Sequence, residues 1–242
     1  MAKSPHLVVL TGAGISAESG IETFRAADGL WANHPIEDVA TPEGWAKNPQ
    51  RVLSFYDARR EQVRDARPNA AHRALANLEA LGFDVSIVTQ NIDDLHERAG
   101  SRQVLHLHGE IMVARSSVDE RMRYPLGRRN IAMGDVCDRG SQLRPDVVWF
   151  GEAVPAYQEA CELVADADLL LVVGTSLAVM PAAALIHELP LDAQCVLVDP
   201  DPGLQVPAGV TRWVMPAGEG VPALTRHWQR EGRLFVPPSG NA

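Results

Sequence analysis

Cysteine is scarce in this chain. Its 242 residues include only three cysteines, Cys137, Cys161 and Cys195, which stand far apart in the sequence. No Cys-x-x-Cys pair occurs, so the sequence predicts neither a disulfide framework nor a zinc site built from four thiolates. An odd and sparse set of thiols is typical of a reducing compartment, and we expect a cytoplasmic protein.

Positive charge and long apolar runs are also lacking. Lysine and arginine number 22 against 31 acidic residues, which gives a net charge of −9. Nucleic acids and anionic membranes attract positive surfaces, so neither is an expected partner. The longest apolar stretch, Leu169–Ile186, is broken by the turn Gly174–Ser176 and by Pro181, so it cannot span a membrane as one apolar helix. The apolar run near the start is too short for a signal peptide.

Aromatic residues make up only 5% of the chain, but 46% hydrophobic and 22% charged residues are ordinary for a globular protein. This balance excludes disordered, collagen-like and coiled-coil classes. At roughly 150 residues per domain, the length fits one large domain, or one with a small insertion.

Short apolar runs rich in β-branched residues alternate with helical patterns. Several runs (LVVL, LLLVV, CVLV) are apolar at successive positions, which indicates strands covered on both faces, as in a parallel sheet. The expected strands are His6–Thr11, Asp84–Thr89, Val104–Leu107, Asp146–Phe150, Asp168–Val173, Gln194–Asp199 and Thr211–Val214. The expected helices are Pro49–Ala66, Asn69–Leu81, Ala156–Asp166, Val179–Leu189 and Pro222–Arg230. This alternation predicts an α/β fold with a doubly wound parallel sheet.

A glycine-rich turn directly follows the first expected strand. Gly12, Gly14 and Ala17 have the G-x-G-x-x-G/A spacing that lets backbone N–H groups approach a pyrophosphate. On its own this pattern fits a nucleotide-binding turn and an ordinary strand-to-helix turn about equally. The acidic residues some 20 positions on, at 37–38, fall in a loop rather than at the end of a second strand, which departs from the usual dinucleotide pattern.

Five motifs then follow in order: TGAGISAESGIETFRAADGLW, TQNIDDLHERAG, HLHGE, PDVVWFGEAVP and GTS. Together they resemble the sirtuin family of NAD-dependent protein-lysine deacylases, most of all its bacterial branch, from about Leu7 to Leu224. The resemblance implies a Rossmann-like NAD-binding domain formed by residues 1–30, 84–110 and 145–235. It also implies a cofactor loop and helical insertion over 31–83, and a small domain over 111–144 equivalent to the family's zinc module.

The resemblance also implies which residues bind NAD. The run Gln90–Asp93 would hold the nicotinamide and its ribose, although a helix N-cap at Asn91 or Asp93 explains the same residues locally. Phe24, in a long polar loop, would shield the reactive ribose from water, although alone it would be a buried anchor. The implied set is Gly12, Ala13, Gly14, Ala17, Phe24, Arg25, Trp31, Gln90, Asn91, Ile92, Asp93, Gly174, Thr175, Ser176, Asp199, Pro200, Asp201 and Ala217. The chain departs from the family pattern at Asp94 and at Asp199.

Two histidines, His106 and His108, alternate at the end of an expected strand. They could form a metal pair, but no third ligand with suitable spacing follows them. The resemblance instead assigns His108 as the catalytic base that deprotonates a ribose hydroxyl after the acyl oxygen has displaced nicotinamide. Asn91 and Asp93 complete the implied catalytic set, and His106 is expected to be a packing residue.

The helix expected around Phe55 carries Arg59 on its apolar stripe, beside Tyr56. Such an arginine commonly reaches the rim of the stripe or pairs with an acid. Tyr-x-x-Arg nevertheless matches the signature of sirtuins that remove acidic acyl groups, and Ala40 matches the small residue that widens their acyl pocket. A guanidinium can hold a carboxylate at two points while the tyrosine donates a further hydrogen bond. The match implies desuccinylase or demalonylase activity, with deacetylase activity beside it.

Two further expectations concern the substrate peptide and zinc. By resemblance, the backbone of Val148, Trp149, Phe150 and Gly151 would pair with an acylated peptide as an added strand. The family's small domain normally carries Cys-x-x-Cys twice, whereas Ile111–Gln142 contains one cysteine and no histidine. We therefore expect no zinc, with packing and arginine–acid pairs in its place.

The activity implied by the resemblance converts NAD and an acylated lysine of a protein or peptide into free lysine, nicotinamide and O-acyl-ADP-ribose. Two alternatives remain open at this point. A protein ADP-ribosyltransferase would use the same cleavage of nicotinamide, and a non-catalytic NAD-sensing module would bind NAD without turnover.

Overall fold

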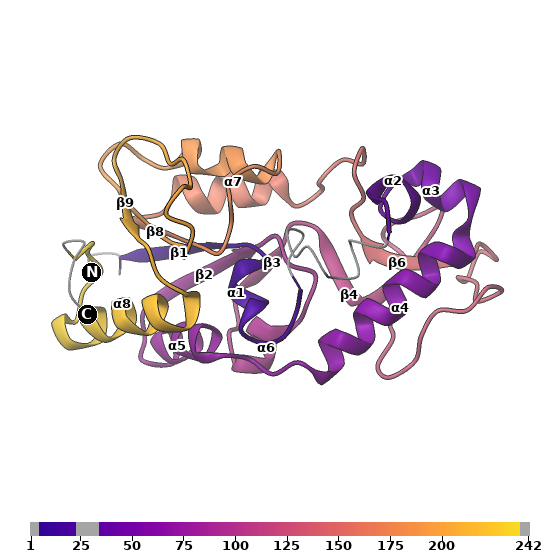
Figure 1. The fold of residues 1–242 in the computed structure, drawn as a ribbon, viewed down its shortest axis with the longest axis horizontal. Coiled ribbons are helices and arrows are strands. Elements are labelled where there is room, and N and C mark those ends of the chain that lie inside the picture. Colours follow the sequence, from indigo (N-terminus) through magenta and orange to yellow (C-terminus); the bar gives the residue numbers. More distant parts are fainter. Residues whose placement is uncertain (1–4, 23–33, 238–242) are drawn as a thin grey trace.

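The computed structural model describes residues 5–22 and 34–237, and its centre is a six-stranded parallel sheet (Figure 1). The strand order is β3-β2-β1-β7-β8-β9, and every neighbouring pair is parallel. The strands are β1 (His6–Thr11), β2 (Asp84–Thr89), β3 (Val104–His106), β7 (Leu169–Val173), β8 (Gln194–Val198) and β9 (Val210–Trp213). The order reverses direction between β1 and β7, where a doubly wound sheet opens its binding crevice.

Helices cover both faces of this sheet. On one face α5 (Ala70–Ala80) and α8 (Ala217–Glu231) pack with Leu7 and Val9 of β1. On the other face α7 (Tyr157–Ala165) and the 3₁₀ helix η2 (Ala182–Glu188) pack with Val8 and Leu10 of the same strand. Successive residues of β1 thus enter opposite cores, which explains why its sequence is apolar without alternation. The predicted doubly wound α/β fold is confirmed.

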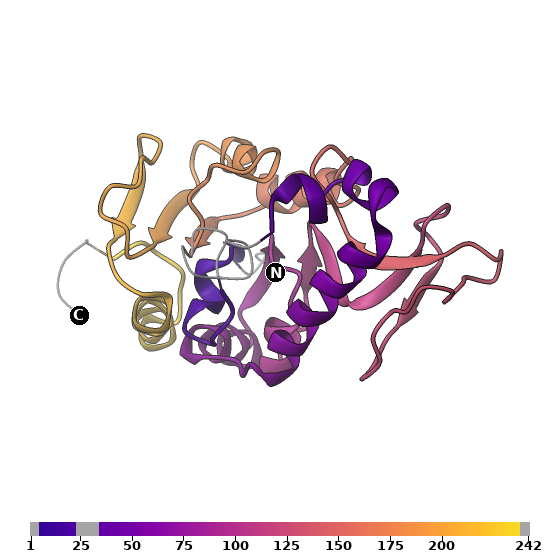
Figure 2. The same ribbon diagram turned by 45° about the vertical axis from the view of Figure 1, so that its right-hand side comes forward.

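A second, smaller sheet stands beside the first. It is antiparallel, with the order β5-β4-β6, and consists of β4 (Gly109–Ser116), β5 (Arg123–Pro125) and β6 (Leu143–Val147). The long helix α4 (Pro49–Asp65) packs against β4 and β6, and the short helices α2 (Ile36–Val39) and α3 (Pro42–Lys47) lie on α4 (Figure 2). Two other short helices, α1 (Gly14–Ala17) and α6 (Leu95–Ala99), follow β1 and β2.

Two sequence predictions about these elements are wrong. The run expected as the strand Asp146–Phe150 of the parallel sheet ends at Val147 as β6, in the antiparallel sheet. Its apolar run resembles a buried parallel strand, but its partner is β4, which the run itself does not reveal. The expected helix Val179–Leu189 is the shorter 3₁₀ helix η2, which starts only after Pro181.

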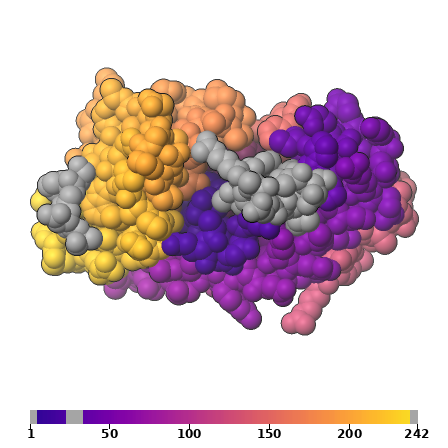
Figure 3. All heavy atoms as spheres, in the orientation of Figure 1, coloured from indigo at the N-terminus to yellow at the C-terminus, as the bar shows by residue number. Residues whose placement is uncertain are grey.

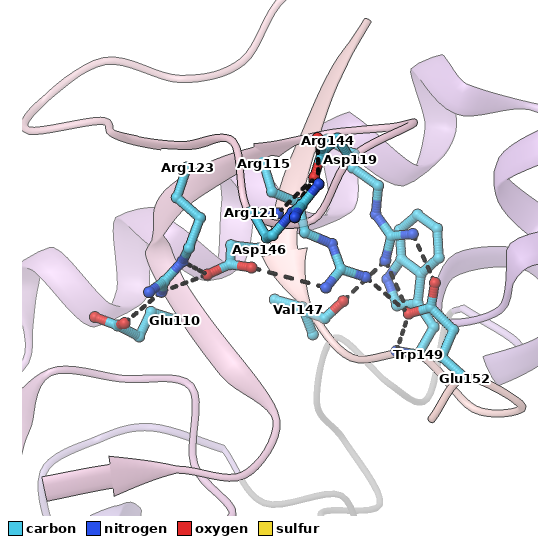
Figure 4. Close-up of polar contacts among 10 residues, drawn as sticks. All are labelled: Glu110, Arg115, Asp119, Arg121, Arg123, Arg144, Asp146, Val147, Trp149 and Glu152. Carbon is cyan, nitrogen blue, oxygen red and sulfur yellow. Dashed lines mark hydrogen bonds and ion pairs between the residues drawn. The ribbon is translucent and has the colours of Figure 1, made fainter. Parts of the chain in front are cut away.

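The second sheet contains a small apolar cluster, and a partly buried charge network connects its strands. The cluster contains Leu53, Ala114, Leu126, Ile131, Cys137 and Leu143. Beside it, Arg144 and Arg115 both donate to the carboxylate of Glu152, at 2.7 Å and 3.2 Å for their shortest contacts. Asp146 accepts from Arg123 at 2.7 Å and lies 3.8 Å from Arg115, so the charges form one continuous network (Figure 4).

No helix in the described parts of the chain is both long and apolar enough to cross a membrane.

We expect Glu152→Gln to lower the free energy of unfolding by about 2 kcal/mol, because it removes the carboxylate that neutralises Arg144 and Arg115 while leaving both guanidinium groups buried. Urea unfolding at neutral pH measures this change. The control is Glu231→Gln, whose pair with Arg230 is exposed and should contribute less than about 0.5 kcal/mol. Equal unfolding midpoints for the two variants would contradict the role given to Glu152.

Candidate active site

Two glycine turns meet at the carboxyl ends of β1 and β7. The N–H of Gly12 donates to Val173 and that of Gly14 donates to Gly174, at 3.0 Å and 2.8 Å. A Cβ atom on Gly14 would lie 2.6 Å from the Cα of Gly174, and Gly174 itself has a φ of +60°. Side chains are therefore excluded from this contact. Figure 3 shows α1, which follows the first turn, between the C-terminal elements and α2–α4.

Next to these turns, a series of buried hydrogen bonds joins α1 to the loop after β2. The amide of Asn91 donates to Ser16 at 3.1 Å, and the hydroxyl of Ser16 donates to the carboxylate of Asp93 at 3.0 Å. Asp93 also accepts from the N–H of Leu95, the first residue of α6, whereas the N-cap position is Asp94 rather than Asn91 or Asp93 as local reasoning expected. Burial raises the pKa of Asp93. Asn91 and Asp93 are thus fixed by one hydroxyl group.

A second series of buried hydrogen bonds connects this loop to the ends of β1 and β2. Thr11 donates to Thr89 at 2.8 Å, and the N–H of Asn91 donates to the same Thr89 hydroxyl. Because the Thr11 hydroxyl donates to Thr89, it accepts at 3.2 Å from Nε2 of His96. The ring of His72 lies 4.8 Å from that of His96. Burial lowers the pKa of His72 to about 4 and that of His96 well below its usual value, so both rings are neutral at pH 7.

His108 lies in the turn between β3 and β4. Its Nδ1–H donates to the carbonyl of Gln90 at 2.9 Å, since a carbonyl can only accept. This bond leaves Nε2 with a lone pair, and burial lowers the pKa of the ring, which keeps it neutral near pH 7. The side chain of Gln90 in turn donates to Thr175 at 3.1 Å, which ties the loops after β2 and β7 together.

His106 makes polar contacts in addition to the packing expected from the sequence. Its Nδ1 lies 3.0 Å from the carbonyl oxygen of Asn91 and its Nε2 lies 2.8 Å from the carboxylate of Glu97. Both partners are acceptors, so an imidazolium satisfies both contacts. Burial by itself lowers the pKa of His106, but the hydrogen bond to Glu97 and its charge outweigh burial and raise it. Glu97, nine residues earlier on α6, was the signal that sequence reasoning missed.

The other expected NAD-binding residues lie at the same edge of the parallel sheet. Asp199 follows β8 and accepts from the N–H of Asp201 at 2.9 Å, so this loop is an Asx turn with its carboxylates near the surface. Ala217 begins α8, and the next N–H, of Gly218, donates to Glu18 at 2.6 Å. Ala13 precedes α1 and Ala17 ends it, and Ile92, Ser176 and Pro200 lie in the loops after β2, β7 and β8. Phe24, Arg25 and Trp31 lie outside the described residues.

The extra acid at Asp94 has a partner in the structure. Its carboxylate accepts from Arg98 at 3.3 Å, one turn along α6. Arg98 also donates to the carbonyl groups of Val63 and Ala66, at the end of α4. The charge that Asp94 adds to the family pattern is therefore neutralised by Arg98. Arg98 in turn connects α6 to the end of α4.

The expected acyl-binding residues gather in the apolar cluster between the two sheets. Tyr56 and Arg59 are 2% and 7% exposed, and Ala40 and Trp149 belong to the same cluster as Tyr56. Burial lowers the pKa of Arg59, and the acidic groups that counter this are Glu22 and Asp93. Arg59 therefore lies inside the molecule near the Asn91–Asp93 loop, rather than at the rim of its stripe.

The segment Val148–Gly151 connects this cluster to His108. The N–H of Val148 donates to the carbonyl of His108 at 2.9 Å, and that of Phe150 donates to Ala40 at 3.0 Å. These bonds place the segment between the expected base and the expected acyl site. Its pairing with a substrate peptide stays a prediction.

Across residues 5–22 and 34–237, no three His, Cys, Asp or Glu side chains form a group that could hold a metal ion. The expectation that zinc is not required stays a prediction.

We expect the protein to lose stability as the pH falls from 6.5 toward 4, because His72 binds its proton in the unfolded chain first. A folded pKa of about 4 against 6.5 corresponds to a loss of roughly 3 kcal/mol once both states are protonated. His72→Gln removes this titration and should flatten the curve of unfolding free energy against pH. Urea unfolding at pH 4.5, 5.5 and 6.5 tests it, and parallel curves for both proteins would contradict it.

Comparison with known proteins gives consistent matches over most of the chain. A model of the Sir2 family matches residues 12–181. A protein of Helicobacter pylori named "NAD-dependent protein deacylase" is 55% identical over 195 residues, which cover 81% of this chain and 84% of that protein. One with the same name from Aggregatibacter actinomycetemcomitans is 53% identical over 82% of this chain and 94% of its own.

Comparison with solved structures also gives matches to Sir2 proteins. A Sir2 homologue in complex with NAD has a TM-score of 0.85 and 43% identity, over 95% of this chain and 91% of that one. A Sir2 protein bound to acetylated peptide has a TM-score of 0.73 and 30% identity, over 95% and 94%.

Proposed function

The chain belongs to the Sir2 family and is an NAD-dependent protein deacylase, and we propose that it removes succinyl and malonyl groups from lysine, with acetyl groups as a second class. The observation that carries the proposal is the buried pair Tyr56 and Arg59 in an apolar cluster beside Ala40. The products are free lysine, nicotinamide and O-acyl-ADP-ribose.

The residues at the open edge of the parallel sheet fit NAD. A Cβ atom on Gly12 would lie 2.7 Å from Thr175, so only glycine keeps the two turns close enough for their backbone to face a pyrophosphate. The carboxylate of Asp199 is suited to accept from ribose hydroxyls. When bound, NAD supplies the ribose carbon that takes the acyl oxygen as nicotinamide departs. The loop Gln90–Asp93 would hold the nicotinamide end.

His108 is placed to act as a base. Its Nδ1–H is held by Gln90, so the ring cannot turn without losing this bond, and Nε2 is the nitrogen that receives a proton. The lowered pKa keeps Nε2 unprotonated at pH 7. His108 therefore takes the proton of a ribose hydroxyl, while Asn91 and Asp93, fixed through Ser16, position the reacting ribose.

Arg59 gives the acyl site its selectivity for acids. Burial removes the guanidinium from water. The terminal carboxylate of a succinyl or malonyl group would therefore recover part of the free energy that this burial costs. The fork of the guanidinium binds a carboxylate at two points, and the Tyr56 hydroxyl supplies a third donor. A neutral acetyl group offers no partner for either side chain. The small side chain of Ala40 leaves room for the longer acyl chain.

The two alternatives from the sequence are not favoured. The curated relatives that match over four fifths of the chain are named deacylases.

We expect Arg59→Met to lower kcat/KM for succinyl-lysine and malonyl-lysine peptides about 100-fold, because it removes a charge-assisted pair of hydrogen bonds. Mass spectrometry of succinyl, malonyl and acetyl peptides, with and without NAD, measures the three activities. Arg64→Met is the matched control, since Arg64 lies further along α4 and binds Asn130 and Arg129 instead. Succinyl turnover that is unchanged in Arg59→Met would refute the proposed acyl class, and His108→Ala supplies the inactive baseline.

We also propose that the small sheet is stable without zinc, on the basis of its apolar cluster and charge network. Protein purified from zinc-supplemented medium should contain far less than one zinc ion per chain, and EDTA should leave its Tm unchanged. Elemental analysis and thermal unfolding measure both. A stoichiometric zinc ion that chelation removes together with stability would overturn the proposal.

A further inference from the structure

The indole of Trp149 is hydrogen-bonded to the acyl site. Its Nε1–H donates to the hydroxyl oxygen of Tyr56 at 3.1 Å, and both side chains are 2% exposed. The two residues are 93 positions apart in the chain, one on α4 and the other after β6. This contact plays no part in the mechanism described above, in which Tyr56 acts only as a donor.

The position of the indole is determined on several sides. The guanidinium carbon of Arg144 lies 3.2 Å from the centre of the Trp149 ring, and the ring of Trp45 lies 5.7 Å away. The N–H of Trp149 donates to Glu152 at 2.8 Å. Glu152 also binds Arg144, so the carboxylate holds both the backbone of Trp149 and the cation stacked on its ring (Figure 4). The indole therefore has little freedom to turn.

The indole N–H of Trp149 donates to Tyr56 from a fixed position, and this restricts the direction of the Tyr56 O–H bond. The phenolic oxygen accepts from Trp149, so its own O–H must be directed away from the indole. Burial raises the pKa of Tyr56, so this proton stays on the oxygen at neutral pH. A hydroxyl that accepts one hydrogen bond also donates a stronger one. The arrangement makes Tyr56 a neutral donor with a set direction.

We propose that Trp149 is a positioning residue for acyl selectivity, because its indole N–H orients the Tyr56 hydroxyl toward the terminal carboxylate of a succinyl or malonyl group held by Arg59. This inference rests on the proposed function and adds a third residue to its acyl site. Trp149 does not touch the acyl group in this scheme. It acts through Tyr56 alone, and Arg144 and Glu152 act through Trp149.

A double-mutant cycle tests the inference. The measured quantity is the ratio of kcat/KM for succinyl peptide to that for acetyl peptide, in which partial unfolding cancels. We expect Trp149→Phe, which keeps a ring but removes the N–H, to lower this ratio about fivefold, mainly through KM for the succinyl peptide. Tyr56→Phe should lower it at least as much. The double variant should be no worse than Tyr56→Phe alone, because Trp149 has then lost the group it orients.

The matched control is Trp228→Phe. Trp228 is fully buried and its Nε1–H donates to the carbonyl of Phe235 at 2.7 Å, so this change also removes a buried indole donor, but in α8. It should leave the succinyl-to-acetyl ratio as in the wild type. A second readout is the indole ¹H–¹⁵N signal of Trp149, which should shift in Tyr56→Phe because its acceptor is gone.

The outcomes separate this inference from the proposed function. If the wild type shows no preference for acidic acyl groups, the proposed function fails and this inference fails with it. If the wild type prefers succinyl peptide but Trp149→Phe lowers the ratio equally with and without the Tyr56 hydroxyl, only the inference is overturned. Trp149 would then act by packing. A Trp149 signal that does not move in Tyr56→Phe would overturn it as well.

Discussion

The close approach of two backbone turns determines how the active site is built. Gly14 and Gly174 are in contact at the carboxyl ends of β1 and β7, and neither position has space for a Cβ atom. Because the turns touch, α1 starts directly over the centre of the sheet, and Ser16 on α1 reaches Asn91 and Asp93 after β2. A larger residue at either glycine would separate the turns and break this bridge. The hydrogen bonds among the proposed catalytic residues therefore depend on the absence of two side chains.

Two neighbouring histidines of the candidate site have opposite pKa shifts. His106 and His108 have the same side chain and stand two positions apart, yet the structure raises the pKa of one and lowers that of the other. The difference lies in their partners. His106 faces the carboxylate of Glu97, which stabilises a positive ring, whereas the buried ring of His108 donates to the uncharged carbonyl of Gln90. His106 contacts the carbonyl of Asn91, and His108, with its lowered pKa, is the ring proposed to take a proton.

The sequence reveals the parts of this molecule that depend on local pattern. Apolar runs identified the strands of the parallel sheet but not β4 or β5, and the buried stripe of α4 contains the Arg59 that its spacing predicted. Local sequence pattern did not reveal the contacts between distant segments. The strand that contains Asp146 reads as apolar and extended, but only its pairing with β4 shows that it belongs to an antiparallel sheet. The bond between Trp149 and Tyr56 likewise joins residues with no shared pattern, since their distance follows from the packing of α4 on the small sheet.

The charge network of the small sheet matters more for position than for stability. Burying a guanidinium and a carboxylate together gains little net free energy, because the loss of hydration offsets their attraction. The apolar cluster around Leu53 and Ile131 is the better candidate for holding the sheet together. The charged groups instead orient their neighbours. Arg144 binds Glu152 and the carbonyl of Val147 while it stacks on the Trp149 ring. These contacts restrict the placement of Trp149, whose indole N–H donates to the hydroxyl of Tyr56. Under the proposed function, this network would help to select the acyl group by positioning Trp149, in addition to the support it gives the small sheet.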